Sequence, residues 1–124
     1  MFELKILTHF AAAHRLTMVA EQCENLHGHN WKIEVCVFGE SLNAAGVLMD
    51  FGELKTFVAE IIRELDHKYL NDLDWFSGAP SSENIAMHIA ERLKERLAAT
   101  QYANVMVGRV TAWESDTAAA TYRP

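Results

Sequence analysis

The segment 27–38 alternates between apolar and polar side chains, and this alternation constrains the fold more than any other feature of the sequence. The two parities are Trp31, Ile33, Val35 and Val37 on one side, and Lys32, Glu34 and Cys36 on the other. Successive side chains of a β-strand point to opposite faces of the sheet. The segment is therefore predicted to be a strand with one face in the core and the other face in water.

Further segments carry strand patterns. Residues 2–14 repeat the alternation, and their apolar parity consists of Phe2, Leu4, Ile6, Phe10 and Ala12. Residues 103–114 and 117–123 are predicted to be two closing strands, and Val47–Met49 a short one. The chain therefore carries two long strands before its middle and two after it.

Two helices are predicted between these pairs of strands. The first spans 50–65, where Asp50 is the N-cap and Glu53 completes a capping-box pattern. The second spans about 82–99, with Ser81 or Ser82 as its cap. Each helix has an apolar stripe at helical spacing, formed by Leu54, Phe57, Val58, Ile61, Ile62 and Leu65 in the first and by Ile85, Ile89, Leu93 and Leu97 in the second. Residues 66–80 are predicted to form a loop.

The order strand–strand–helix–helix–strand–strand predicts an α+β fold in two layers. Two helices that each bury one stripe can cover one face of a four-stranded antiparallel sheet. A chain of 124 residues has the size of one domain, and no linker or repeat divides it. We therefore expect residues 1–124 to form a single domain.

Charge and hydropathy argue against several classes of protein. The formal net charge is −6 and the pI about 5.4, whereas a nucleic-acid-binding platform usually needs a basic face. No segment approaches the roughly 18 apolar residues of a membrane span. The first residues also lack the long apolar stretch of a signal peptide. We therefore expect a cytoplasmic protein whose two cysteines, Cys23 and Cys36, are free thiols.

Three histidines are placed where they could hold one metal ion. His27 and His29 open the second strand two residues apart, so both share the parity of its apolar face. His14 ends the first strand on that strand's apolar parity, and antiparallel pairing would bring it beside His27. Three neutral imidazoles suit zinc and leave one coordination position for water or substrate. The alternative is a turn at 27–29 and a packed core residue at His14. His9 and His88 are expected at the surface or at an interface.

Four other residues could carry chemistry near such a site. Cys23 lies in a polar segment, where it is either an incidental loop thiol or a base activated by zinc or a cationic histidine. Asp66 and His67 form an acid–base pair, or His67 only stabilises a helix C-terminus. Glu114 ends an apolar strand, where it either faces water or accepts two adjacent N–H donors of a ligand. We expect Glu114 to lie outside the histidine cluster.

Most of these residues belong to blocks that follow one another along nearly the whole chain. The blocks are Ala12-Ala13-His14-Arg15-Leu16, Cys23-x-x-x-His27-Gly28-His29-Asn30, Asp50-Phe51-x-Glu53-Leu54-Lys55, Leu65-Asp66-His67-x-Tyr69-Leu70-Asn71, Pro80-Ser81-Ser82-Glu83-Asn84 and Glu114. As a set they resemble the 6-pyruvoyltetrahydropterin synthase family. The three residues between Cys23 and His27 resemble its bacterial 6-carboxytetrahydropterin synthases, which serve the queuosine (7-deazaguanine) pathway.

The resemblance implies a tunnelling fold, assembled as a homohexamer of two trimers with sites at subunit interfaces. It implies zinc ligands at His14, His27 and His29, catalytic residues at Cys23, Asp66 and His67, and a pterin anchor at Glu114. The substrate would be 7,8-dihydroneopterin triphosphate, cleaved to 6-carboxytetrahydropterin, acetaldehyde and triphosphate. The alternatives are triphosphate elimination to 6-pyruvoyltetrahydropterin, and a zinc protein that binds a pterin without turning it over. The triphosphate contacts stay open among Arg15, Lys68, Arg109 and Arg123.

Overall fold

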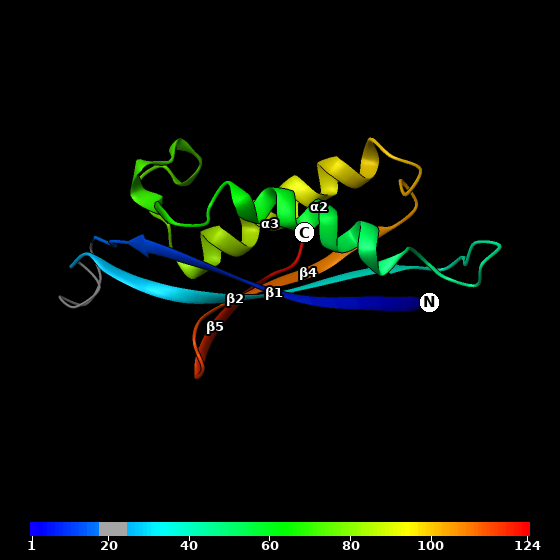
Figure 1. Ribbon diagram of the computed structural model, residues 1–124, viewed down its shortest axis with the longest axis horizontal. Helices are drawn as coiled ribbons and strands as arrows, with labels where there is room; N and C mark the ends of the chain where they lie inside the picture. Colours follow the sequence, from blue (N-terminus) through cyan, green and yellow to red (C-terminus); the bar gives the residue numbers. More distant parts are fainter. Residues whose placement is uncertain (18–24) are drawn as a thin grey trace.

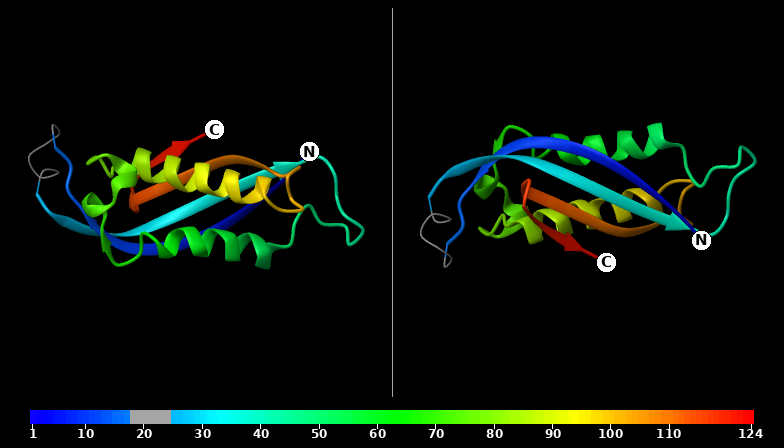
Figure 2. Two further views of the ribbon diagram at one scale, coloured as in Figure 1. Left: turned by 90° about the horizontal axis from the view of Figure 1, so that it is seen from above. Right: turned by 90° about the horizontal axis from the view of Figure 1, so that it is seen from below.

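The computed structural model describes residues 1–17 and 25–124, and these form two layers (Figure 1). A five-stranded sheet is one layer, and two helices lie side by side across one of its faces (Figure 2). The strands are β1 (Phe2–His14), β2 (His27–Gly39), β3 (Lys68–Tyr69), β4 (Met106–Ser115) and β5 (Ala118–Tyr122). The helices are α2 (Phe51–Arg63) and α3 (Ser82–Ala98), with short 3-10 helices η1 (Leu70–Asp72) and η2 (Asp74–Phe76). The predicted α+β fold with two helices on one face is confirmed.

The sheet has the order β3-β1-β2-β4-β5. Strands β1, β2, β4 and β5 pair antiparallel, as predicted. The short strand β3 pairs parallel with the outer edge of β1, so the segment predicted to be a loop adds a fifth strand. This pairing holds part of the 66–80 segment against the end of β1.

The predicted short strand at Val47–Met49 is wrong. Asn43 closes a turn there, because its side-chain oxygen accepts the backbone N–H groups of Ala45 and Val47. Leu48 and Met49 are buried as part of the core, where they precede α2. The apolar residues Leu48 and Met49 therefore reflect burial in the core and not pairing in a strand.

Both predicted helix caps are present. The Asp50 side chain accepts the backbone N–H of Glu53, and the Ser81 side chain accepts that of Asn84. The apolar stripes of both helices face the sheet, where they meet the buried parity of β2. Among the described residues, no helix is both long and apolar enough to cross a membrane.

The register of the strands brings several chain segments to one end of the sheet. The ladder between β1 and β2 ends with His14 opposite His27 and Ala12 opposite His29. The end of β4 lies beside the start of β2, with Trp113 opposite Lys32. Because β3 lies on the other side of β1, three strand ends and the 66–80 segment meet here, at the left of Figure 1.

Candidate metal centre

Four side chains from three strands converge at this end of the sheet. They are His14 of β1, His27 and His29 of β2, and Glu114 of β4, and one potential ligand atom from each lies within 4.8 Å of all the others. The Oε1 atom of Glu114 is 3.1 Å from the Nε2 atom of His14 and 2.9 Å from that of His29. It is 3.8 Å from the Nε2 atom of His27. The three histidines thus meet as strand parity predicts.

The position of Glu114 differs from the sequence-based expectation, because it lies inside the cluster and not outside it. It shares the parity of Val110 and Ala112, which are fully buried and face the helices. The β4–β5 ladder shifts register between Trp113 and Ser115, so Glu114 has no partner residue on β5. Such irregularities re-aim side chains at the ends of sheets. The buried parity of β4 was a signal in the sequence for this placement.

Backbone carbonyl groups fix the tautomers of two of the histidines. The Nδ1 atom of His14 lies 2.7 Å from the carbonyl oxygen of Pro80, and that of His27 lies 2.7 Å from the carbonyl oxygen of Asn25. A carbonyl oxygen only accepts hydrogen bonds, so each Nδ1 atom carries the hydrogen and donates it. The Nε2 atoms are thereby directed into the cluster, which is the arrangement typical of metal-binding histidines.

Burial shapes the electrostatics of the cluster. His14 is fully buried, and its ring and that of His29 each form a T-shaped pair with the buried Trp31 ring. Burial lowers the pKa of His29, and His14 and His27 lower it further, although Glu114 raises it. Lowering this pKa favours the neutral imidazole, which is the form that binds a metal ion.

The donor set fits a divalent transition metal. The buried Nε2 atom of His29 has no hydrogen-bond partner, even though the Glu114 carboxylate is close, because the geometry is not that of a hydrogen bond. An unsatisfied buried nitrogen is rare in a folded protein and calls for an explanation. Three imidazole nitrogens and a carboxylate are typical zinc ligands, so an ion at this position would satisfy that nitrogen.

Asp66 and His67 form a second group, on the outer edge of β1. The carboxylate of Asp66 accepts the backbone N–H of Ala11 at 3.0 Å and lies 3.0 Å from the Nδ1 atom of His67. The backbone N–H of His67 donates to the Ala11 carbonyl group, and His67 has a φ of 58°. A non-glycine residue in this left-handed region is uncommon and concentrates at functional sites.

Hydrogen bonding keeps the Asp66 carboxyl group ionised. The N–H of Ala11 holds the pKa of Asp66 below its usual value, and His67 lowers this pKa further. The carboxylate can therefore orient the His67 ring at neutral pH. The structure brings Asp66 and His67 together as the sequence analysis expected, but outside the metal-ligand cluster.

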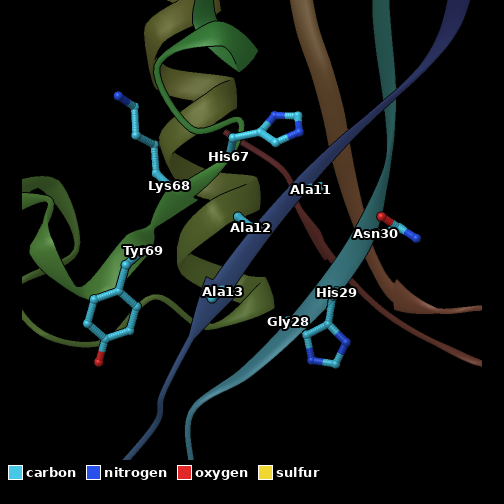
Figure 3. Close-up of a pocket in the computed structure, with 9 residues that line it drawn as sticks. All are labelled: Ala11, Ala12, Ala13, Gly28, His29, Asn30, His67, Lys68 and Tyr69. Carbon is cyan, nitrogen blue, oxygen red and sulfur yellow. The ribbon is translucent and has the colours of Figure 1, made fainter.

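One pocket joins the two groups. It has a volume of about 540 Å³ and is lined by residues 11–13, 28–30 and 67–69, so both His29 and His67 belong to its wall. Figure 3 shows β1 crossing this pocket, with β2 on one side and β3 on the other. The pocket therefore places a metal-ligand candidate and an acid–base candidate around one volume.

The four basic residues that were candidates for phosphate binding lie in different places. Lys68 lines the pocket with His29 and His67. Arg109 is paired with Glu34 on the sheet face that the helices do not cover. Arg123 lines a different pocket, near Pro124. Arg15 follows His14 and is exposed.

The remaining expectations have mixed outcomes. Cys23 lies outside the described residues. His9 is exposed, as expected. His88, expected at the surface or at an interface, has a half-buried ring that stacks on Trp75 and contacts Phe76. Burial accordingly lowers the pKa of His88.

The carbonyl groups of Asn25 and Pro80, which orient His27 and His14, were not predicted from the sequence. Every residue has a carbonyl group, so no residue type marks this role. The block that contains Pro80 was the one indirect signal.

The lowered pKa of Asp66 predicts a pH-dependent contribution to stability. Because the folded-state pKa is depressed, the contribution is present above the usual value of 3.8 and is lost as pH falls through the folded-state pKa. Asp66→Asn should therefore lower the free energy of unfolding of metal-free protein at pH 7, and the difference should become smaller as the pH falls below 3.8. Urea unfolding at pH 7 and at about pH 3 measures it, with the exposed Asp116→Asn as control. A difference of equal size at both pH values would contradict this account.

Comparison with known proteins supports one family. The family model described as 6-pyruvoyl tetrahydropterin synthase matches residues 3–124. The chain is 38% identical over 107 residues to the dihydroneopterin monophosphate aldolase of Pyrococcus furiosus, covering 86% of this chain and 84% of that protein. It is 38% identical over 91 residues to a putative 6-carboxy-5,6,7,8-tetrahydropterin synthase of Archaeoglobus fulgidus, covering 73% and 75%. It is 37% identical over 103 residues to the human 6-pyruvoyl tetrahydrobiopterin synthase, covering 71% of each chain.

A solved structure shares the fold. The 6-pyruvoyl tetrahydropterin synthase of Caenorhabditis elegans matches with a TM-score of 0.83 at 26% identity, covering 99% of this chain and 95% of that one.

Proposed function

Because the chain belongs to the 6-pyruvoyl tetrahydropterin synthase family, whose members are lyases acting on pterins, we propose that it is a zinc enzyme for 7,8-dihydroneopterin triphosphate. The proposed products are 6-carboxy-5,6,7,8-tetrahydropterin, acetaldehyde and triphosphate, and the pterin product would enter queuosine (7-deazaguanine) biosynthesis. The observation that carries the proposal is the convergence of His14, His27 and His29 beside the pocket that His67 also lines.

The Nε2 atoms of His14, His27 and His29 would hold the zinc ion. A bound zinc ion would supply Lewis-acid polarisation of the oxygen atoms on the substrate's side chain. Four protein ligands would close the coordination sphere, whereas catalysis needs one open position. For this reason we assign Glu114 to the pterin, where its carboxylate would accept a ring N–H and the neighbouring amino group.

Cys23, Asp66 and His67 would handle protons. Cys23 would act as the general base, as the family resemblance implies. The ionised Asp66 would orient His67, whose ring lies 3.0 Å from that carboxylate and lines the pocket. This pair would help Cys23 to exchange protons with the substrate.

Lys68 would contact the phosphate groups. It lines the pocket shared by His29 and His67, whereas Arg109 is already paired with Glu34. An ammonium group can bind phosphate oxygens without changing the metal ligands.

Two other reactions remain as alternatives. The first is elimination of triphosphate to give 6-pyruvoyltetrahydropterin. The second is favoured by the 38% identity to the Pyrococcus furiosus aldolase: cleavage of a carbon–carbon bond in dihydroneopterin monophosphate. A third possibility is a protein that binds zinc and a pterin without turnover.

Product analysis separates these reactions. The zinc-loaded protein is incubated with dihydroneopterin triphosphate and, in parallel, with the monophosphate, and products are identified by mass spectrometry. Acetaldehyde and 6-carboxytetrahydropterin from the triphosphate support the proposal. A pyruvoyl product identifies the elimination, and cleavage of the monophosphate alone identifies the aldolase. A pterin that binds without reacting identifies the binding protein.

The assignment of Glu114 predicts a loss of pterin affinity without a loss of zinc. In Glu114→Gln, the glutamine NH2 group would face an N–H donor of the pterin. The glutamate carboxylate would accept a hydrogen bond from that donor, and the NH2 group cannot. An unmatched buried donor costs about 1–3 kcal/mol, so affinity should fall by roughly ten- to a hundredfold. The measurement is a titration of parent and variant with a non-reactive pterin such as sepiapterin, plus a zinc assay. Because the carboxylate lies among the histidines, loss of zinc would instead make Glu114 a fourth ligand.

We also predict that the protein assembles as a hexamer. Among the described residues, strand pairing along the outer edge of β1 is limited to Ala12 and Ala13, which pair with β3, and the five-residue β5 forms the opposite edge of the sheet. Open sheet edges favour pairing with further strands. Light scattering should give a mass of about six times the 14.0 kDa of the chain. A monomer at working concentration would contradict the assembly and the site shared between subunits.

A further inference from the structure

The Pro80 carbonyl group that holds His14 belongs to a tight turn just before α3. The backbone N–H of Ser81 donates to the carbonyl oxygen of Ala79 at 2.9 Å. This bond spans two residues and closes a γ-turn with Pro80 at its centre, where the proline ring already restricts φ. The turn therefore fixes the peptide group that joins Pro80 to Ser81.

The geometry of a peptide group determines the direction in which the Pro80 carbonyl group points. In a planar trans peptide, the C=O of one residue and the N–H of the next point in opposite directions. When the Ser81 N–H is held on Ala79, the Pro80 C=O must point away from the turn. The Nδ1 atom of His14 lies in that direction, 2.7 Å from the Pro80 oxygen.

The side chain of Asn84 stabilises the turn through a hydrogen bond. Its Nδ2 atom donates to the Ala79 carbonyl oxygen at 2.8 Å, the same oxygen that accepts the Ser81 N–H. The backbone N–H of Asn84 separately donates to the Ser81 hydroxyl group, which is the α3 cap. Only the first of these two contacts depends on the Asn84 amide group.

We propose that Asn84 is a positioning residue of the metal centre. It holds the turn at Pro80, which fixes the tautomer and the ring orientation of His14 and so presents the Nε2 atom of His14 to the metal ion. The inference rests on the zinc site proposed above. It assigns a role to an asparagine that belongs neither to the histidine cluster nor to the residues that line the pocket.

Asn84→Asp separates this role from a structural one. The aspartate has nearly the same shape and keeps the backbone N–H that bonds to Ser81. A negative charge in the first turn of α3 interacts favourably with the helix dipole and should stabilise the helix. The aspartate cannot, however, donate to the Ala79 oxygen, and it places two acceptors against each other. A purely structural role therefore predicts no loss of zinc affinity, whereas the positioning role predicts weaker zinc binding.

The test is a zinc titration of metal-free protein in competition with a chromogenic chelator. Loss of an outer-shell partner typically weakens metal binding by about ten- to a hundredfold, and we expect this for Asn84→Asp and for the uncharged Asn84→Ala. Asn43→Asp is the matched control, because it makes the same charge change in a remote turn and keeps its oxygen acceptor. Circular dichroism and Tm of the metal-free variants show whether each is folded.

The outcomes distinguish the inference from the proposed function. If the parent binds no zinc, both are overturned. If the parent binds zinc and folded Asn84→Asp and Asn84→Ala bind it equally well, the inference alone is overturned. An equal loss in Asn43→Asp would also overturn it, because charge and not position would then explain the effect. Failure of both Asn84 variants to fold would make Asn84 a residue of the fold and overturn the positioning role.

Discussion

Replacement of His29 by alanine is expected to remove most of the zinc from the protein and, with it, the activity. The Nε2 atom of His29 is buried, has no hydrogen-bond partner, and lies with those of His14 and His27 in one cluster. Two imidazoles alone make an incomplete zinc site, because structural and catalytic sites use at least three protein ligands. Atomic absorption should fall from about one zinc per chain to a small fraction of it.

His9→Ala is the matched control for this experiment. His9 lies on the same strand as His14 but is exposed and has the opposite parity. The His9 variant should therefore keep its zinc. Full zinc occupancy in the double variant His27→Ala/His29→Ala would refute the assignment of the metal centre.

Replacement of Cys23 by alanine is expected to abolish turnover while the zinc stays bound. In the proposed site the three histidines would already provide the ligands, so the thiol would serve the substrate and not the ion. A positioned general base contributes about a hundred- to ten-thousandfold to rate, and the loss should be of this size. Steady-state turnover and zinc content are measured on the same preparation.

Cys36→Ala provides the comparison for Cys23. Cys36 is a buried free thiol on the β2 parity opposite to the histidines, and burial raises its pKa. A buried thiol of this kind is unreactive, so its replacement should leave both zinc and turnover in place. Loss of zinc in Cys23→Ala would instead make Cys23 a fourth ligand and close the site.

The sequence predicted the long elements because their periodicity reports burial directly. The alternation of 2–14 and 27–38 became β1 and β2, and the two capped stripes became α2 and α3. It failed where tertiary contacts decide the structure. Leu48 and Met49 are apolar because they fill the core, and β3 forms only because the 66–80 segment returns to β1.

The candidate site also has features that the sequence predicted and features that it did not. Strand parity and antiparallel pairing were enough to bring His14 beside His27 and His29. Glu114 was misplaced although it shares the buried parity of Val110 and Ala112, because the sequence does not show that the end of β4 lies beside the start of β2. The roles of the Pro80 and Asn25 carbonyl groups could not be predicted, because every residue has a backbone carbonyl group. The role of Cys23 came from the family resemblance, since its segment has no strand or helix period to place it.

The unbroken ladder between β1 and β2 also bears on how such a chain can change in evolution. His14 and His27 are the last pair of this ladder, so added or deleted residues between them lengthen or shorten a connection without shifting either strand. A single-residue deletion inside β1 would instead turn His14 to the opposite face of the sheet. Homologous chains can therefore vary the segment that carries Cys23 while the histidines keep their places. New specificities are expected to arise through changes in the length of that connection.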